Sequence, residues 1–164
     1  MKTFKTKFAI LIIALLSISC NKDDDSSTPT PSGNDNFLRC KVEGVNYEAL
    51  GDAILLDQST AAFNFRSDIS GGGTGLDFSI QGEPVVGTYN FDGANVTTVG
   101  RLNYKMGGTT YSSGICTTSS GILTITSKTG KTIEGTFSIA AKRAIGCLDA
   151  PKLITDGTFK ITFP

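Results

Sequence analysis

Alternation of apolar and polar residues with a period of two is the feature that most restricts the fold of this chain. Leu76, Phe78 and Ile80 alternate with polar neighbours, and similar sets run through residues 38–42, 45–49, 63–66, 85–91 and 159–163. Each set predicts a half-buried strand, and no window of ten or more residues shows a helical period. We therefore expect about eight to ten strands with mostly hairpin connections, in an antiparallel β-sandwich or a closed β-barrel.

The sharpest local prediction is a hairpin around residues 128–130. We expect Lys128, Thr129 and Gly130 to form a three-residue loop with Gly130 in the left-handed region, in a G1 bulge. Ser127 then faces Lys131 and Ile125 faces Ile133. This register places one apolar set on one sheet face and a polar set on the other. The apolar set is Leu123, Ile125, Ile133, Phe137 and Ile139, and the polar set is Thr124, Thr126, Thr132, Glu134, Thr136 and Ser138.

The first residues have the composition of a secretory signal peptide. Three lysines precede the apolar run of residues 8–16, and small residues lead to Cys20. The run is shorter than the ~20 residues that a membrane-spanning helix needs. We expect residues 1–19 to be removed, residues 20–36 to be a disordered tether and residues 37–164 to form a single β-domain.

Charge excludes some partner classes. Lys2, Lys5, Lys7 and Lys22 precede residue 37, as do four aspartates, so from Phe37 onwards 11 basic residues balance 11 acidic ones. A neutral domain has no electrostatic footprint for nucleic acid. The chain has no histidine, which removes Ser-His and Cys-His catalysis and the usual catalytic zinc ligands. We recognise no catalytic residues, no cofactor site and no metal site.

Three cysteines remain beyond Cys20, an odd number. In the predicted register Cys116 lies opposite Lys142, and Cys147 follows after Gly146, where the chain can turn back. We predict a Cys116–Cys147 disulfide, with reduced, buried thiols as the alternative. Cys40 lies on an apolar face and is expected to be a small buried hydrophobe.

Tyr104 and Tyr111 are the candidate ligand contacts. They occur in a glycine-rich stretch that mixes aromatic and polar residues, and an exposed tyrosine could stack on a sugar or contact a protein. The alternative is that both rings simply pack against neighbouring strands.

The residues around Cys20 resemble known export signals. Leu16-Ser17-Ile18-Ser19-Cys20 resembles a bacterial lipobox, although Ser17 stands where leucine is usual. Asn21 followed by Lys22, Asp23, Asp24 and Asp25 is similar to the acidic export signal of surface lipoproteins in the Bacteroidota. The domain is also similar to uncharacterised small lipoproteins of that phylum, on residues 41–49, 121–126, 135–138 and 154–159. The resemblance implies an all-β domain with acyl chains on Cys20, and it carries no known activity.

The resulting functional hypothesis is a non-enzymatic binding or envelope module. It is held in the outer membrane by the acyl chains on Cys20, faces the cell exterior and binds a glycan or a protein. Its rivals are a secreted hydrolase that uses two carboxylates and a purely structural envelope component. The sequence does not indicate the ligand or the oligomeric state.

Overall fold

The computed structural model describes residues 35–58, 61–67, 73–93, 98–143, 145 and 147–164. The chain divides into two compact units, Met1–Thr30 and Pro31–Pro164, and every described residue belongs to the second. The predicted signal peptide, Cys20 and the Lys22–Asp25 run lie outside the described residues. No helix in the described part is long and apolar enough to cross a membrane.

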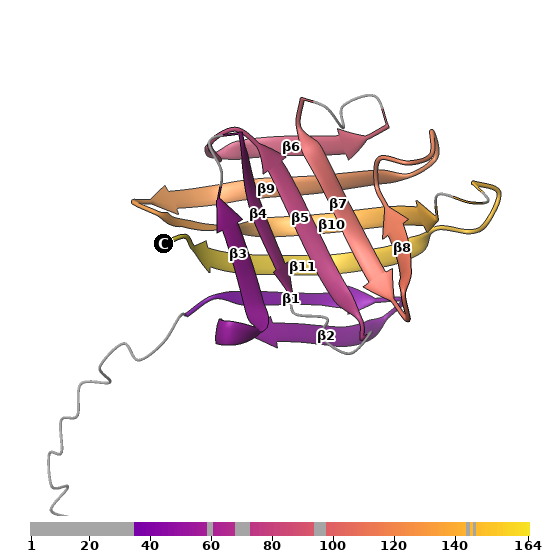
Figure 1. The fold of residues 1–164 in the computed structure, drawn as a ribbon, viewed down its shortest axis with the longest axis horizontal. Coiled ribbons are helices and arrows are strands. Elements are labelled where there is room, and N and C mark those ends of the chain that lie inside the picture. Colours follow the sequence, from indigo (N-terminus) through magenta and orange to yellow (C-terminus); the bar gives the residue numbers. More distant parts are fainter. Residues whose placement is uncertain (1–34, 59–60, 68–72, 94–97, 144, 146) are drawn as a thin grey trace, which may run out of the picture. The chain divides into compact units, whose positions relative to one another are not determined.

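The second unit is all-β, as predicted, and antiparallel throughout its strand pairs (Figure 1). Its strands are β1 (Phe37–Val42), β2 (Val45–Leu50), β3 (Ile54–Gln58), β4 (Ala62–Ser67), β5 (Gly75–Gln81), β6 (Gly87–Asp92), β7 (Gly100–Met106), β8 (Thr109–Ser112), β9 (Ser120–Thr129), β10 (Thr132–Arg143) and β11 (Lys152–Thr162). A three-residue 3₁₀ turn, η1 (Gly51–Ala53), connects β2 to β3. The eleven strands slightly exceed the eight to ten expected from the sequence, and β3, β7 and β8 are those for which no alternating pattern was recognised.

The sheet folds over on itself and is nearly closed, like a barrel. The larger half has the order β2-β1-β11-β10-β9-β6, and the smaller half has the order β3-β4-β5-β7-β8. Strand β10 joins the halves, because Lys142 and Arg143 at its end pair with Ser112 and Tyr111 of β8. Figure 1 shows the strands of the smaller half crossing those of the larger half steeply, as in orthogonally packed sheets whose strands pass from one sheet to the other.

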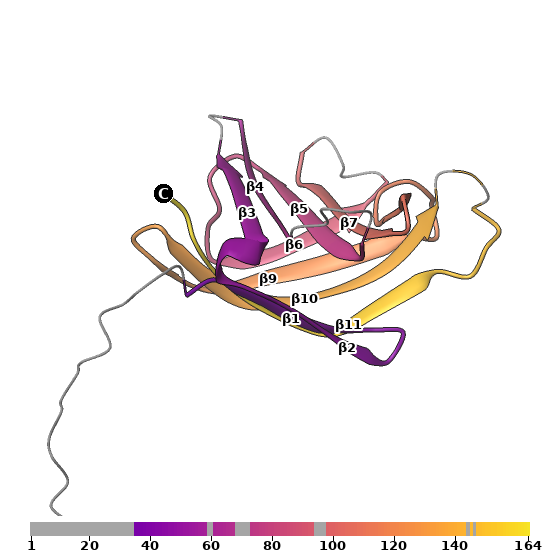
Figure 2. The same cartoon turned by 60° about the horizontal axis from the view of Figure 1, so that its bottom comes forward.

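Two irregularities curve the larger half, which bends around the smaller half in Figure 2. In β9 the register shifts between Ser127 and Ile125, so that Thr126 is the extra residue opposite Glu134 and Gly135. In β11 the register shifts against both neighbours around Asp156, whose φ is +54°. An extra residue in one strand bends it and increases the local twist.

The β9–β10 hairpin differs from the prediction in its loop. Thr129 pairs with Thr132, so the loop is the two residues Gly130 and Lys131, and beyond the bulge Phe137 pairs with Leu123. Gly130 has the predicted positive φ, +57°, which is the sign that a type II′ turn requires at its first loop position. The bulge therefore lies at Thr126 and not at the turn. Because the shift beyond the bulge is an even number of residues, the predicted apolar face is still buried.

Phenylalanines from both halves fill the interior. Phe65 and Phe78 of the smaller half stack with ring centroids 4.6 Å apart, and Phe78 meets Phe137 of the larger half edge to face at 4.9 Å. Glycines make room for these rings. A Cβ on Gly135 would lie 2.9 Å from Phe159 Cζ, and one on Gly157 would lie 2.6 Å from Phe137 Cδ2. Because side chains fill the interior, we look for binding sites in clefts at the ends and on the outer faces of the domain.

Candidate functional site

Four connections lie at one end of the domain, opposite the end where β1 begins (Figure 1). They are the β1–β2 and β7–β8 turns and the β8–β9 and β10–β11 connections, and we call this end the distal end. Six of the eleven exposed large apolar side chains among the described residues belong to it: Val45, Met106, Ile115, Ile145, Leu148 and Leu153. Such a concentration is typical of a binding surface, whereas single exposed apolar residues are ordinary.

A cleft of about 360 Å³ opens between the two halves at this end. We call it the tyrosine cleft. Tyr47 of β2 and Tyr104 of β7 line it together with Met106, Asn46 and Thr74. Its volume lies within the range of small-ligand sites, about 300–1,000 Å³. The lining combines apolar surface with two phenol hydroxyls and an amide, so it suits a partner that presents both apolar and hydrogen-bonding groups.

Both tyrosines of the cleft are neutral phenols, and burial raises the pKa of each further. Burial raises the pKa of Tyr104 against the opposing effect of a hydrogen bond with Thr74. Burial also raises the pKa of Tyr47, where a hydrogen bond with Ser67 acts in the opposite direction. Both hydroxyls therefore stay neutral at ordinary pH and serve the cleft as hydrogen-bonding groups.

Glu43 fixes the rim of the cleft. This residue has a left-handed φ of +50°, and its carboxylate accepts a hydrogen bond from the Leu153 N–H at 2.6 Å. The Glu43 N–H in turn donates to the Leu153 carbonyl at 2.9 Å, and Lys152 Nζ lies 3.4 Å from the same carboxylate. The Leu153 hydrogen bond lowers the pKa of Glu43, and Lys152 adds to this effect. The β1–β2 turn is thereby attached to the start of β11.

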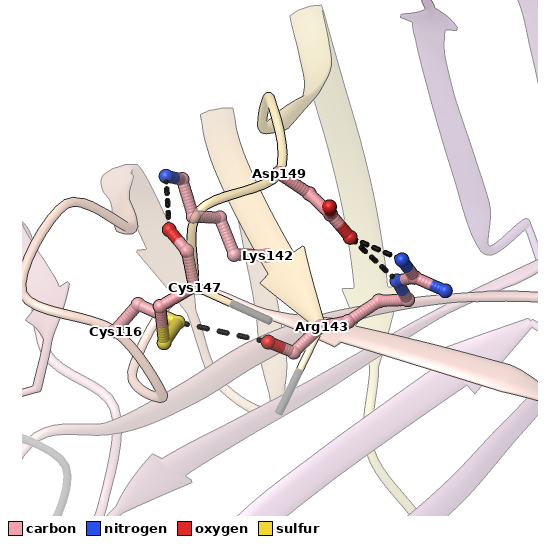
Figure 3. A network of polar contacts seen from close by, with 5 residues as sticks. All are labelled: Cys116, Lys142, Arg143, Cys147 and Asp149. Atoms are coloured by element: carbon pink, nitrogen blue, oxygen red, sulfur yellow. Dashed lines mark hydrogen bonds and ion pairs between the residues drawn. A yellow bond between two sulfur atoms is a disulfide. The ribbon is translucent and has the colours of Figure 1, made fainter. Parts of the chain in front are cut away.

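A disulfide braces the other side of the distal end. Cys116 and Cys147, the predicted pair, are joined with their Cα atoms 5.7 Å apart, which ties the β8–β9 connection to the β10–β11 connection (Figure 3). Lys142 Nζ donates to the Cys147 carbonyl at 2.8 Å, and Arg143 Nε donates to Asp149 at 3.0 Å. These contacts hold the connection while Ile145 and Leu148 stay 88% and 99% exposed.

The disulfide was predicted correctly, but from a strand register that the structure does not have. Lys142 lies opposite Ser112 of β8, and Cys116 lies beyond β8 in the connection to β9. The pair still forms because both connections emerge at the same end of the domain. Cys40 is buried and free, as predicted.

Of the two candidate ligand contacts, Tyr104 lines the cleft but is only 3% exposed. It therefore offers an edge and a hydroxyl, and not the exposed face that stacking on a sugar requires. Tyr111 is half-buried and packs against Tyr104 with ring centroids 5.8 Å apart. The structure therefore shows the alternative, in which both rings pack against neighbouring strands.

The sequence did not single out Tyr47, Asn46 or Thr74 as site residues. Tyr47 occurs in a recognised strand pattern, and the Glu43–Gly44 turn beside it was also recognisable. Their meeting with Tyr104 depends on how the two halves fold over each other, and no local pattern encodes that arrangement.

In the described part of the chain, no three His, Cys, Asp or Glu side chains gather in a way that could hold a metal ion. The carboxylates whose pKa is displaced, Glu43 and Glu83, are both displaced downward, Glu83 by its hydrogen bond with Lys128. A glycosidase's general acid needs the opposite displacement. Asp57 and Asp77 do share a small cleft on the outer face of β3–β5.

Comparisons with models of known families, with curated proteins and with solved structures find no match for this chain. The resemblance to Bacteroidota surface lipoproteins therefore stays a prediction from the sequence.

Proposed function

We propose that this chain is a non-enzymatic binding module, anchored in the outer membrane by acyl chains on Cys20 and facing the cell exterior. Its distal end binds another protein of the cell envelope. The observation that carries the proposal is the tyrosine cleft, at the same end of the domain as six exposed apolar residues, of which Val45 and Met106 line it. Tyrosine, methionine and apolar side chains are typical of the buried centre of protein interfaces, with charged residues at the rim.

The bracing of the distal end supports this proposal. Glu43 and the Cys116–Cys147 disulfide order its connections without a partner. A surface that is already ordered loses less conformational entropy when it binds. Connections that served only to join strands would not need to hold apolar side chains in solvent.

The test measures binding of a fluorescent probe to intact cells that lack the protein. The probe is residues 20–164 with Cys20→Ala, which cannot be acylated. We expect saturable binding that disappears when the cells are treated with trypsin beforehand. Val45→Asp, in which a 71% exposed residue at the cleft rim becomes charged, should weaken binding at least about tenfold, since a desolvated unpaired charge costs several kcal/mol.

Val86→Asp is the matched control, because Val86 is also exposed but lies on the β5–β6 connection at the opposite end. It should bind like the parent. Equal loss in both variants, or the absence of saturable binding, would overturn the proposal. Binding that survives trypsin would exclude a protein partner.

A further inference from the structure

We propose a second binding site, on the outer face of the smaller half, that takes a single saccharide ring. It is independent of the distal end and of the partner proposed for it. The site is a cleft of about 160 Å³ lined by Leu55, Asp57, Asn64, Arg66 and Asp77. We call it the outer cleft.

Strand register assembles the polar groups of the outer cleft. In one row across the sheet, Leu55 pairs with Arg66, and Arg66 pairs with Asp77. In the adjacent row, Asp57 pairs with Asn64. Because alternate residues of a strand share a face, the two rows lie next to each other on the outer surface. Two carboxylates, an amide and a guanidinium thus converge on one small space.

The cleft has hydrogen-bonding capacity that the protein leaves unused. Among the described residues, every lysine side chain has an ion pair or a hydrogen bond within the chain, and so do Arg39 and Arg143. Arg66 and Arg101 are the basic side chains of that part of the chain with neither, and both lie on this face. Within the described residues Asp57 has no ion pair either, whereas Asp77 Oδ2 lies 3.2 Å from Lys105 Nζ.

These groups match the chemistry of a sugar ring. Carboxylates accept hydrogen bonds from hydroxyl groups, guanidinium donates to them, and the amide does both. Leu55 is 41% exposed at the edge of the cleft and offers an apolar surface to the C–H face of a ring. The volume is below the ~300–1,000 Å³ of sites for drug-sized ligands, so it suits one monosaccharide residue, such as the end of a glycan chain.

The test is saturation-transfer NMR on residues 20–164 with Cys20→Ala. The probes are methyl β-glucoside, methyl β-galactoside, methyl α-mannoside and N-acetylglucosamine. We expect at least one of them to receive saturation. Arg66→Gln and Asn64→Ala should each weaken that binding at least tenfold, with unchanged thermal midpoints to show that the variants fold.

Two variants serve as controls. Arg39→Gln removes an arginine from the outer face of the larger half, where it pairs with Glu48, and should bind like the parent. Val45→Asp, at the distal end, should also leave sugar binding unchanged. The proposal is overturned if no probe receives saturation or if Arg66→Gln binds like the parent. Loss of sugar binding in Val45→Asp would show that the sugar binds at the tyrosine cleft. That result would also overturn the proposal of a sugar site in the outer cleft, but not the proposal that the distal end is a binding surface.

Discussion

At the scale of single residues, Glu43 attaches the rim of the tyrosine cleft to the start of β11. Its carboxylate accepts a hydrogen bond from the backbone N–H of Leu153 at the start of β11, at 2.6 Å. Because this contact is exposed, the hydrogen bond replaces one to water, and its net contribution to stability is small. Glu43 therefore attaches the rim of the cleft to β11 through hydrogen bonds as well as through packing.

Glu43→Gln tests this role through its pH dependence. The Leu153 hydrogen bond lowers the pKa of Glu43 from its ordinary 4.5, so the stabilisation is complete above pH 4.5 and is lost as the pH falls through the folded-state value. Glutamine keeps an acceptor for Leu153 but has no charge to lose. We expect the parent to be more stable at pH 7 by under about 1 kcal/mol, because the ion pair with Lys152 is exposed.

The measurement is thermal unfolding of the parent and of Glu43→Gln between pH 7 and pH 3. The difference between their midpoints should shrink as the pH falls below 4.5 and vanish at the acid end. If the difference between the midpoints stayed constant across this range, the stabilisation would not depend on the charge of the Glu43 carboxylate.

At the scale of elements, the β9–β10 hairpin shows what sequence patterns can and cannot predict. The alternation of Leu123, Ile125, Ile133 and Phe137 correctly predicts the buried face. The loop length was wrong because a glycine in the left-handed region fits both a three-residue loop and a two-residue turn. Only the bulge at Thr126 distinguishes them, and it depends on how the larger half bends over the core.

Gly130→Val tests the turn. A Cβ at this position would meet no atom within 4 Å, so the cost comes from the backbone conformation alone. A β-branched residue at φ +57° should cost more than the ~1–2 kcal/mol of an ordinary residue there. Thr129→Val is the control, because it places the same β-branched side chain at the neighbouring residue, whose φ is not positive. If Gly130→Val unfolded at the parent's midpoint, Gly130 would not need its positive φ.

The disulfide gives the second prediction at this scale. It links residues 31 apart in sequence, and the chain-entropy model gives a stabilisation of about 3–4 kcal/mol. Cys147→Ser should lower the thermal midpoint accordingly and leave Ile145 and Leu148 on a looser connection. Non-reducing peptide mapping should recover Cys116 joined to Cys147.

Cys40 is the internal control for that mapping. Burial raises the pKa of its thiol to about 12, so it should alkylate only after the protein is unfolded. Recovery of Cys40 in a disulfide, or its rapid alkylation in the native protein, would contradict the packing of β1.

At the scale of the whole molecule, most strands could be predicted and the two clefts could not. Period-two patterns identify strands such as β5 because they report burial on one face. The tyrosine cleft joins Tyr47 to Tyr104 across the two halves, and the outer cleft joins Asp57 to Asp77 across three strands. The tyrosine cleft depends on the folding of one half over the other, which pairing at long sequence separation decides. The outer cleft depends on the pairing of β3 with β4 and of β4 with β5.

The proposed export signal adds a prediction at this scale. Replacing Lys22, Asp23, Asp24 and Asp25 by alanine should keep the acyl chains on Cys20 but leave the domain facing inward. The reason is that a solvated tether needs no charge cluster at its first residues, since any polar sequence would serve. If protease treatment of intact cells removes the variant's domain as readily as the parent's, the Lys22–Asp25 run is only a linker.

Surface display by Cys20 is the central claim, because a distal end that faced the periplasm could not meet a partner protein exposed on the cell surface. Antibody labelling of the domain on intact cells, compared with lysed cells, tests it most directly. We predict that the parent is labelled equally well before and after lysis, while Cys20→Ala gives no labelling on intact cells. Labelling of the parent only after lysis would contradict the account.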